Sequence, residues 1–276
     1  MARSWAADAL ALVRARNLLL SAAGVAIGGV LAQGRATFPA MVWWAMASAA
    51  CLGAAGNVAN DVADREADRL NRPDAPLIGG SVSVAAALAL GGVAGGLGLF
   101  LAWWVSAELF AIALAALLVM LVYSPLLKRH GLAGNIAVAV VASLPVIYGA
   151  SAVGWWRAGL APAAMAALLH FSRELVKDVE DEAGDRAAGR RTLPIVYGSK
   201  TALALAVGAL GLFVPVSLAP WAAGWYGRRY VVLVTLIDVG VVALAWRLIE
   251  QKVEGVRATL KTAMLAGLIA LLWDRL

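Results

Sequence analysis

The sequence predicts an all-α membrane protein, a polytopic bundle of nine transmembrane helices. Hydrophobic residues make up 62% of the 276-residue chain and charged residues only 14%, and the mean hydropathy is +0.82. A soluble domain is typically about half apolar and about a quarter charged. The apolar excess runs along the whole chain instead of one segment, which is typical of a protein that crosses the bilayer repeatedly.

Nine apolar segments each have close to the roughly 20 residues that a helix needs to cross the hydrocarbon core. They cover residues 14–33, 38–59, 84–105, 108–125, 133–153, 159–177, 200–219, 229–249 and 257–274. Several are rich in Ala and Gly, which let helices approach closely in lipid. Tryptophan pairs near the span ends suit the membrane interface, at Trp43-Trp44, Trp103-Trp104 and Trp155-Trp156.

Lysine and arginine gather in alternate connections between these spans, with Arg228-Arg229 as the exception. The positive-inside rule therefore predicts a cytoplasmic N-terminus and an external C-terminus. Two long inside connections, about residues 59–83 and 178–199, would cap a central cavity of a single domain over residues 1–276. The net charge of +6 indicates contact with bilayer lipids. Nucleic-acid binding is not indicated, because the sequence has no basic stripe interleaved with aromatic residues.

The connection after the second span opens with a dense acidic run. Residues 60–68 contain four acids and an amide within nine residues. Asn60, Asp64 and Asp68 are spaced four apart, and Asn57 lies one turn earlier. On a helix such side chains stack along one face, where like charges repel one another unless a cation lies between them.

The connection after the sixth span repeats this pattern, with Asp181 and Asp185 four apart and Asp178 one turn earlier. In the nine-span topology both clusters lie on the cytoplasmic side. Mg²⁺ takes oxygen ligands and commonly bridges carboxylates to substrate phosphates. The sequence therefore predicts a metal–diphosphate site with these ligands: Asn60, Asp64, Asp68, Asp181 and Asp185.

Other polar and basic residues on the same side would complete a site for a polyanion. The candidates for binding the diphosphate or substrate are Arg14, Asn17, Asn57, Arg72, Tyr123, Lys128, Lys177 and Asp178. Arg190 and Arg191, behind the second acidic run, would add positive charge. Lys128 equally fits a positive-inside stop signal, and Lys177 fits simple pairing with the acids. Glu174 is a weaker candidate for a base or supporting role.

These motifs resemble those of the UbiA superfamily of intramembrane prenyltransferases. Its first motif, NDxxDxxxD, is matched by Asn60-Asp61, Asp64 and Asp68, and its second, DxxxD, by Asp181 and Asp185. A tyrosine-to-lysine motif is matched by Tyr123 and Lys128, and the resemblance covers nearly the whole chain. Three further segments, residues 71–76, 173–185 and 192–198, resemble the archaeal branch of the superfamily. That branch makes digeranylgeranylglyceryl phosphate. One departure is Ala75, where relatives often have arginine.

The resemblance implies Mg²⁺-dependent transfer of a prenyl group, expected to be geranylgeranyl, from a polyprenyl diphosphate donor to a lipid acceptor. In the archaeal branch the acceptor is geranylgeranylglyceryl phosphate. The catalytic carboxylates would be Asp64, Asp68, Asp181 and Asp185, in a plasma-membrane enzyme whose active site faces the cytoplasm. With Mg²⁺ as cofactor, the bond between the allylic carbon and the diphosphate oxygen would break and the diphosphate would leave.

Two alternatives stay open from the sequence. An aromatic prenyltransferase would use 4-hydroxybenzoate or a quinone or haem precursor as acceptor, and acceptor choice depends on the shape of the pocket. A cation transporter would also use acidic residues. Transporters usually place their coupling acids near the membrane midplane, whereas the acids of this chain cluster at one face.

Overall fold

The computed structural model describes residues 5–35, 37–71, 73–123, 131–187 and 189–275, and the regular structure in these ranges is entirely helical. The long helices are α2 (Ala15–Gln33), α3 (Ala40–Ala63), α5 (Val84–Val105), α6 (Ala107–Tyr123), α7 (Leu132–Ser151), α8 (Leu160–Glu180), α11 (Ser199–Ala222), α12 (Arg228–Ile249) and α13 (Val256–Arg275). The short ones are α1 (Trp5–Leu12), α4 (Arg65–Asn71), α9 (Glu182–Ala187), α10 (Leu193–Tyr197) and the 3-10 helix η2 (Trp156–Gly159). The all-α prediction is confirmed.

Within the described part of the chain, seven helices are long and apolar enough to cross a membrane: α2, α3, α5, α7, α11, α12 and α13. Helix α6 is apolar but has 17 described residues, about 26 Å of helix, which is less than the roughly 30 Å of hydrocarbon core. Helix α8 carries charged side chains over its last two turns. An apolar membrane bundle is therefore confirmed, whereas the nine crossings and their orientation stay predictions.

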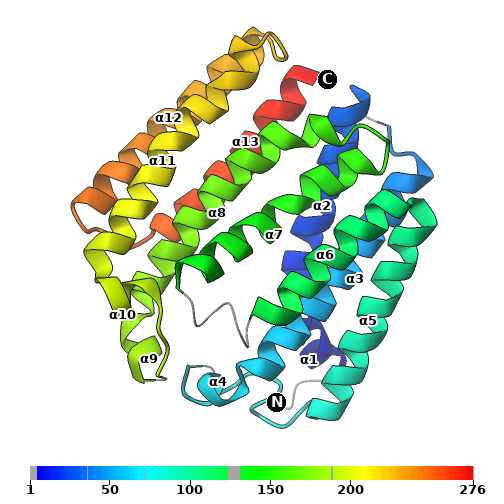
Figure 1. Cartoon of the computed structure of the whole chain (residues 1–276), viewed down its shortest axis with the longest axis vertical. Coiled ribbons are helices and arrows are strands. Elements are labelled where there is room, and N and C mark those ends of the chain that lie inside the picture. The colour runs from blue at the N-terminus through cyan, green and yellow to red at the C-terminus, as the bar shows by residue number, and fades with distance from the viewer. Residues whose placement is uncertain (1–4, 36, 72, 124–130, 188, 276) are drawn as a thin grey trace.

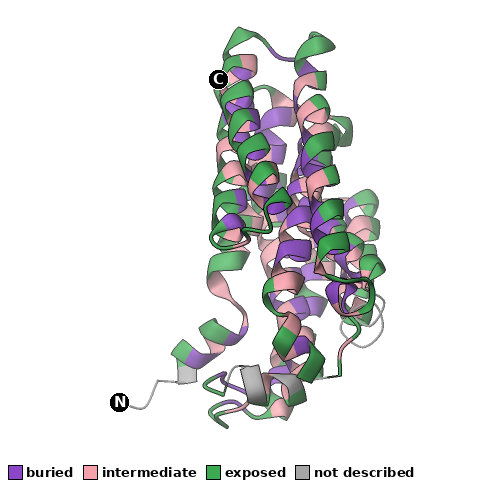
Figure 2. Ribbon diagram, turned by 90° about the vertical axis from the view of Figure 1, so that its left-hand side faces the viewer, coloured by how far each residue is buried: buried purple, intermediate pink, exposed green. Residues whose placement is uncertain are grey.

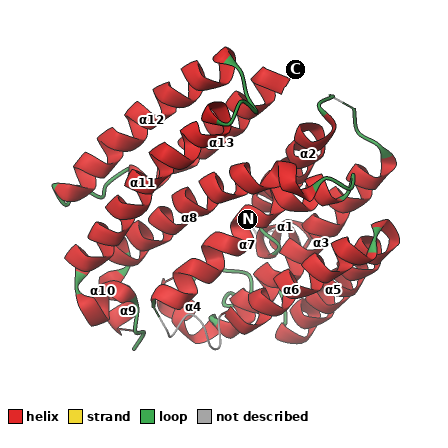
Figure 3. Cartoon of the chain, turned by 45° about the horizontal axis from the view of Figure 1, so that its top comes forward, coloured by secondary structure: helices red, strands yellow, loops and turns green. Residues whose placement is uncertain are grey.

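The long helices form two groups that lie side by side (Figure 1 and Figure 3). Helices α8, α11, α12 and α13 share a core that contains Leu169, Phe213 and Tyr230. Helices α2, α3, α5, α6 and α7 enclose a second core around Leu52 and Leu109. The groups meet where α7 packs against α8 and α2 packs against α13.

The outer faces of the bundle are exposed (Figure 2), and many of the exposed side chains are large and apolar. Val93 and Leu236 are 71% and 66% exposed, which would be unfavourable in water over such an area and is expected of side chains that face lipid. Exposed tryptophans such as Trp103, Trp155 and Trp273 lie near helix ends. Their amphipathic rings suit the headgroup region.

Helices α2 and α7 approach each other closely through glycines. A Cβ atom on Gly28 would lie 2.0 Å from the carbonyl oxygen of Val146, and one on Gly149 would lie 1.8 Å from that of Val25. Only a residue without a side chain fits at such distances. Helices α2 and α7 both begin at the end of the bundle that carries the acidic motifs.

We expect Gly149→Ala to lower the free energy of unfolding by about 3 kcal/mol, because the added methyl group forces α2 and α7 apart. Thermal unfolding of the detergent-solubilised protein measures the change. Gly208→Ala is the matched control, since nothing lies within 4 Å of a Cβ atom at Gly208. Equal stability of the two variants would contradict the close packing.

The short helices α1, α4, α9 and α10 gather at one end of the bundle, and the C-terminus lies at the opposite end (Figure 1). Helices α3 and α8 both run toward the end that carries the short helices. The two acidic motifs, which are more than a hundred residues apart in the sequence, therefore meet at the same end.

Candidate functional site

The two acidic motifs adopt the same backbone geometry. Helix α3 ends before Asp64 (φ −87°, ψ 4°) and α8 ends before Asp181 (φ −90°, ψ 2°), and α4 and α9 begin at the next residue. The backbone N–H of Asp68 donates to the Asp64 carbonyl at 2.9 Å, and that of Asp185 donates to the Asp181 carbonyl at 2.9 Å. The helical four-residue spacing of each motif thus survives the break between the helices.

The motifs face a common cavity of about 620 Å³, called here the acidic cavity. Among the described residues its lining has six carboxylates and three cations. The carboxylates are Asp64, Asp68, Asp178, Glu180, Asp181 and Asp185, and the cations are Arg14, Lys177 and Arg190. Asn60, the remaining predicted metal ligand, lines it too. Such an excess of negative charge favours a cationic ligand.

Arg190 joins the two acidic walls. Its guanidinium donates to Asp185 Oδ1 at 2.8 Å and to Asp64 Oδ1 at 3.5 Å. The side chains of Arg190, Asp185 and Asp64 are 20%, 6% and 13% exposed. A protein cation therefore lies between the opposed carboxylates and offsets their repulsion.

The donor set of the acidic cavity fits a divalent cation. Carboxylate and amide oxygens are the ligands that Mg²⁺ prefers. Thr192 also lines the cavity, is 4% exposed, and its buried Oγ1 has no hydrogen-bond partner within the described part of the chain. In the same described ranges, no three His, Cys, Asp or Glu side chains are close enough to hold a metal ion by themselves. The acids instead face one another across the cavity, with Arg190 between two of them.

We expect Arg190→Gln to lower the free energy of unfolding by about 2 kcal/mol in EDTA, because two largely buried carboxylates lose their shared counterion. Adding Mg²⁺ should then stabilise the variant more than the unaltered protein. Thermal unfolding with EDTA and with Mg²⁺ measures both effects. Arg186→Gln is the control, since Arg186 is 61% exposed and pairs with Glu182. A Mg²⁺ effect of equal size in both variants would count against a shared cation site.

Asp178 is held at the cavity by α7. The side-chain amide of Asn135 donates to Asp178 Oδ2 at 3.0 Å, and Asn135 is 6% exposed. Burial raises the pKa of the Asp178 carboxyl to about 6, and the Asn135 hydrogen bond partly opposes this shift. A cation bound nearby would favour the ionised carboxylate, so Asp178 is coupled electrostatically to the occupancy of the acidic cavity.

Arg14 is fixed at the edge of the cavity by Asp61. Asp61 is 5% exposed and accepts a hydrogen bond from Arg14 Nη2, and it is not among the cavity-lining residues. Arg14 has φ 56° and ψ 56°, a left-handed conformation that is unfavourable for a residue with a side chain. The Asn57 amide donates to the Val13 carbonyl at 2.8 Å and secures the same junction of α1 and α2.

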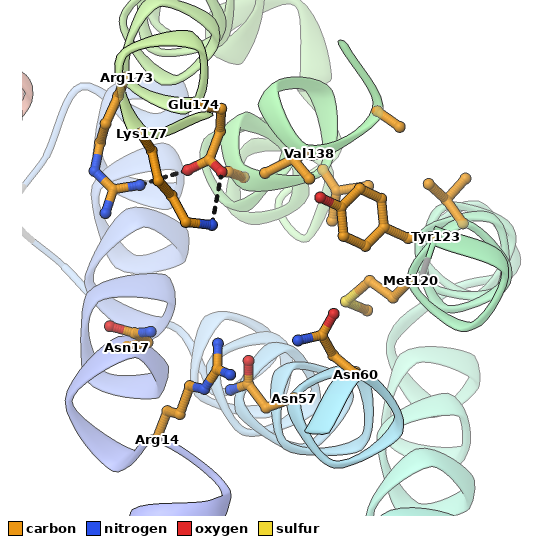
Figure 4. A pocket seen from close by; sticks show the side chains of 15 residues that line it. Arg14, Asn17, Asn57, Asn60, Met120, Tyr123, Val138, Arg173, Glu174 and Lys177 are labelled. Atoms are coloured by element: carbon orange, nitrogen blue, oxygen red, sulfur yellow. Dashed lines mark hydrogen bonds and ion pairs between the residues drawn. The ribbon is translucent and has the colours of Figure 1, made fainter. Parts of the chain in front are cut away.

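A second cavity of about 430 Å³, called here the inner cavity, adjoins the acidic cavity (Figure 4). The two share Arg14, Asn60, Tyr123 and Lys177. On each helix, the residues that line only the inner cavity lie farther from the acidic end of the bundle than the residues that line the acidic cavity do. One wall is apolar and is formed by Val119, Met120, Ala137, Val138, Val141 and Ala142; the polar wall includes Asn17, Asn57, Arg173 and Glu174.

Every described residue of the predicted metal-binding and substrate-binding sets lines one of these two cavities, whereas Arg191, which was expected to add positive charge, lines neither. Asn17 and Asn57 line the inner cavity, whereas Arg72 and Lys128 lie outside the described residues. The sequence motifs assigned no role to Arg173 or Asn135. For Arg173 the available signal was its position one helical turn before Lys177 on the same face.

Comparison with known proteins agrees with this architecture. The model of the UbiA prenyltransferase family matches residues 21–269. A digeranylgeranylglyceryl phosphate synthase from Natronomonas pharaonis is 36% identical over 272 residues, which cover 96% of this chain and 95% of the relative. One from Halobacterium salinarum is 38% identical over 261 residues, which cover 93% of each chain.

Solved structures share the fold. A structure from a study of digeranylgeranylglyceryl phosphate synthase in membranes aligns with a TM-score of 0.86 at 25% identity, over 98% of both chains. A UbiA homolog from Archaeoglobus fulgidus bound to GPP and Mg²⁺ aligns with a TM-score of 0.70 at 20% identity, over 96% of this chain and 99% of that one. Between the enzyme and transporter alternatives, the family match decides for an enzyme: the chain belongs to the UbiA prenyltransferase family.

Proposed function

We propose that this enzyme transfers a geranylgeranyl group from geranylgeranyl diphosphate to geranylgeranylglyceryl phosphate, with Mg²⁺ as cofactor. The observation that carries the proposal is the meeting of two acidic helix ends across one cavity that adjoins an apolar-walled cavity. The relatives named digeranylgeranylglyceryl phosphate synthase support the choice of acceptor, and the homolog bound to GPP and Mg²⁺ supports the donor class and the metal.

The two acidic walls would hold the metal from opposite sides. Asn60, Asp64 and Asp68 stand on one wall, and Asp181 and Asp185 stand on the other. When bound, Mg²⁺ supplies positive charge that stabilises the diphosphate as a leaving group. Carboxylates alone would repel the diphosphate of the donor, whereas carboxylates that hold Mg²⁺ would bind it through the metal.

Cationic and phenolic side chains at the junction of the cavities would bind the diphosphate oxygens directly. Arg14, Lys177 and Tyr123 line both cavities, and Arg190 lies between the acidic walls. Negative charge grows on the diphosphate as its bond to the allylic carbon breaks. Hydrogen bonds from charged donors therefore strengthen toward the transition state, which is the requirement for catalysis.

The apolar wall of the inner cavity would enclose the reacting carbon. Val119, Met120 and Val138 exclude water from this side, so the carbocation-like prenyl group is protected from hydrolysis. The electron pair of the broken C–O bond leaves with the diphosphate. The acceptor hydroxyl oxygen forms the new C–O bond and releases its proton, and the strength of the electrophile makes a strong general base unnecessary.

We also propose that residues 1–276 form a single domain in the plasma membrane, with the site open to the cytoplasm. The clustering of both motifs at one end of the bundle supports a single reacting face. The Lys- and Arg-rich connections at this end support the cytoplasmic side under the positive-inside rule.

A product assay tests the function. The purified protein is given radiolabelled geranylgeranyl diphosphate, Mg²⁺ and either geranylgeranylglyceryl phosphate or 4-hydroxybenzoate. We expect the label in digeranylgeranylglyceryl phosphate. Geranylgeranylated 4-hydroxybenzoate as the sole labelled product would overturn the choice of acceptor, and the absence of any prenylated product would overturn the function.

A further inference from the structure

We propose that Arg173, one helical turn from Lys177 at the junction of the cavities, binds the phosphate group of the acceptor and so selects a phosphate monoester over acceptors that lack one. This inference rests on the proposed function and assigns a second anion site, distinct from the site of the donor's diphosphate. The ligand class is an alcohol that carries a phosphate monoester close to the attacking hydroxyl.

The charge of the inner cavity differs from that of the acidic cavity. Among the described residues that line the inner cavity, Arg14, Arg173 and Lys177 are cationic and Glu174 is the one carboxylate. The acidic cavity has the opposite balance, with six carboxylates and three cations. A second anion is therefore repelled by the acidic cavity and attracted by the inner one.

Glu174 positions both cations. Arg173 Nη1 donates to Glu174 Oε1 at 2.6 Å, and Lys177 Nζ donates to Glu174 Oε2 at 3.4 Å. Glu174 is 7% exposed. One buried carboxylate thus positions two cations, so the three side chains together have a net charge of one positive unit. Arg173 and Lys177 also have further N–H groups that can donate hydrogen bonds to a ligand. Figure 4 shows this trio on one side of the cavity, across from Arg14 and Asn57.

Arg173 is the cation whose substitution can test acceptor binding apart from donor binding. Arg14 and Lys177 line both cavities, whereas Arg173 lines the inner cavity and not the acidic one. On α8 it lies one turn, about 6 Å, before Lys177 and thus farther from the acidic motif. The charge of Arg14 is matched by its ion pair with Asp61, so the surplus charge belongs to Arg173 and Lys177.

The chemistry of the acceptor fits this position. Its attacking hydroxyl must reach the allylic carbon at the junction of the two cavities, and its phosphate is only a few bonds from that hydroxyl. The phosphate must therefore lie beside the junction, on the side away from the carboxylates. A planar guanidinium offers paired N–H donors that suit phosphate oxygens.

The test compares two acceptors, geranylgeranylglyceryl phosphate and geranylgeranylglycerol, with geranylgeranyl diphosphate as donor. In Arg173→Gln we expect kcat/KM for the phosphorylated acceptor to fall about 30-fold, because a charge-assisted contact is lost. The values for the unphosphorylated acceptor and the KM of the donor should change less than about threefold. Arg173→Lys, which keeps the charge, should retain part of the preference, and Arg186→Gln, at a residue that lines neither cavity, should retain all of it.

The outcomes separate this inference from the proposed function. If the unaltered protein prenylates the phosphorylated acceptor but Arg173→Gln keeps the full preference for it, the phosphate site is wrong and the function stands. Equal losses with both acceptors would also overturn the site, since they indicate a role in folding or donor binding. Should Arg173→Gln fail to fold, the preference in Arg173→Lys decides, and an undiminished preference overturns the site. If the unaltered protein prenylates neither glyceryl acceptor, the proposed function itself fails.

Discussion

Asp181→Asn is expected to reduce the rate of prenyl transfer by roughly 1,000-fold and to leave the fold intact. Asp181 lies at the break between α8 and α9 and its side chain is exposed. An exposed carboxylate that is replaced by an amide of the same shape changes stability little. A large loss of activity therefore reports the loss of a metal ligand. Initial rates with labelled geranylgeranyl diphosphate, together with thermal unfolding, separate the two effects.

Glu66→Gln provides the matched control for Asp181→Asn. Glu66 lies at the same end of the bundle, its side chain is 75% exposed, and it pairs with Arg69. It does not line either cavity. We expect this variant to keep the rate of the unaltered protein. Full activity in Asp181→Asn would contradict the assignment of Asp181 as a metal ligand. A comparable loss of activity in Glu66→Gln would show that the overall charge of this face, and not a metal ligand, is responsible for the loss.

Removal of divalent cations with EDTA is expected to stop prenyl transfer, and Mg²⁺ in excess of EDTA should restore it. The six carboxylates of the acidic cavity repel a diphosphate strongly unless cations neutralise them, and the three cations that line the cavity leave an excess of negative charge. The same assay measures the rate in EDTA, after Mg²⁺ is restored, and with K⁺ as a control for ionic strength. Sustained turnover in EDTA would contradict a divalent-metal mechanism.

The sequence was sufficient to predict those parts of the fold that depend on local patterns. Apolar segments of membrane-spanning length predicted helices, and each predicted range contains a helix. The four-residue spacing of Asp64 and Asp68 predicted two acids on adjacent turns, which the backbone preserves. The extent of membrane crossing was less predictable, since α6 is short and α8 ends in charged turns.

The features that the sequence did not predict depend on contacts between distant residues. The breaks at Asp64 and Asp181 interrupt segments whose residues are compatible with continuous helix. The contact of Arg190 with Asp64 joins residues 126 apart, and the bond from Asn135 to Asp178 joins different helices. Arg173 lines the inner cavity because several helices come together around that cavity. Such placements follow from packing and leave no pattern in local spacing.

Both acidic walls must hold the same divalent cations if the donor's diphosphate binds between them. Mn²⁺ takes similar oxygen ligands, and its electron paramagnetic resonance signal reports binding directly in the presence of geranylgeranyl diphosphate. Asp64→Asn and Asp181→Asn should each weaken Mn²⁺ binding about tenfold or more, whereas Glu66→Gln should leave it unchanged. Mn²⁺ binding that survives the loss of either wall would contradict a site shared between the two motifs.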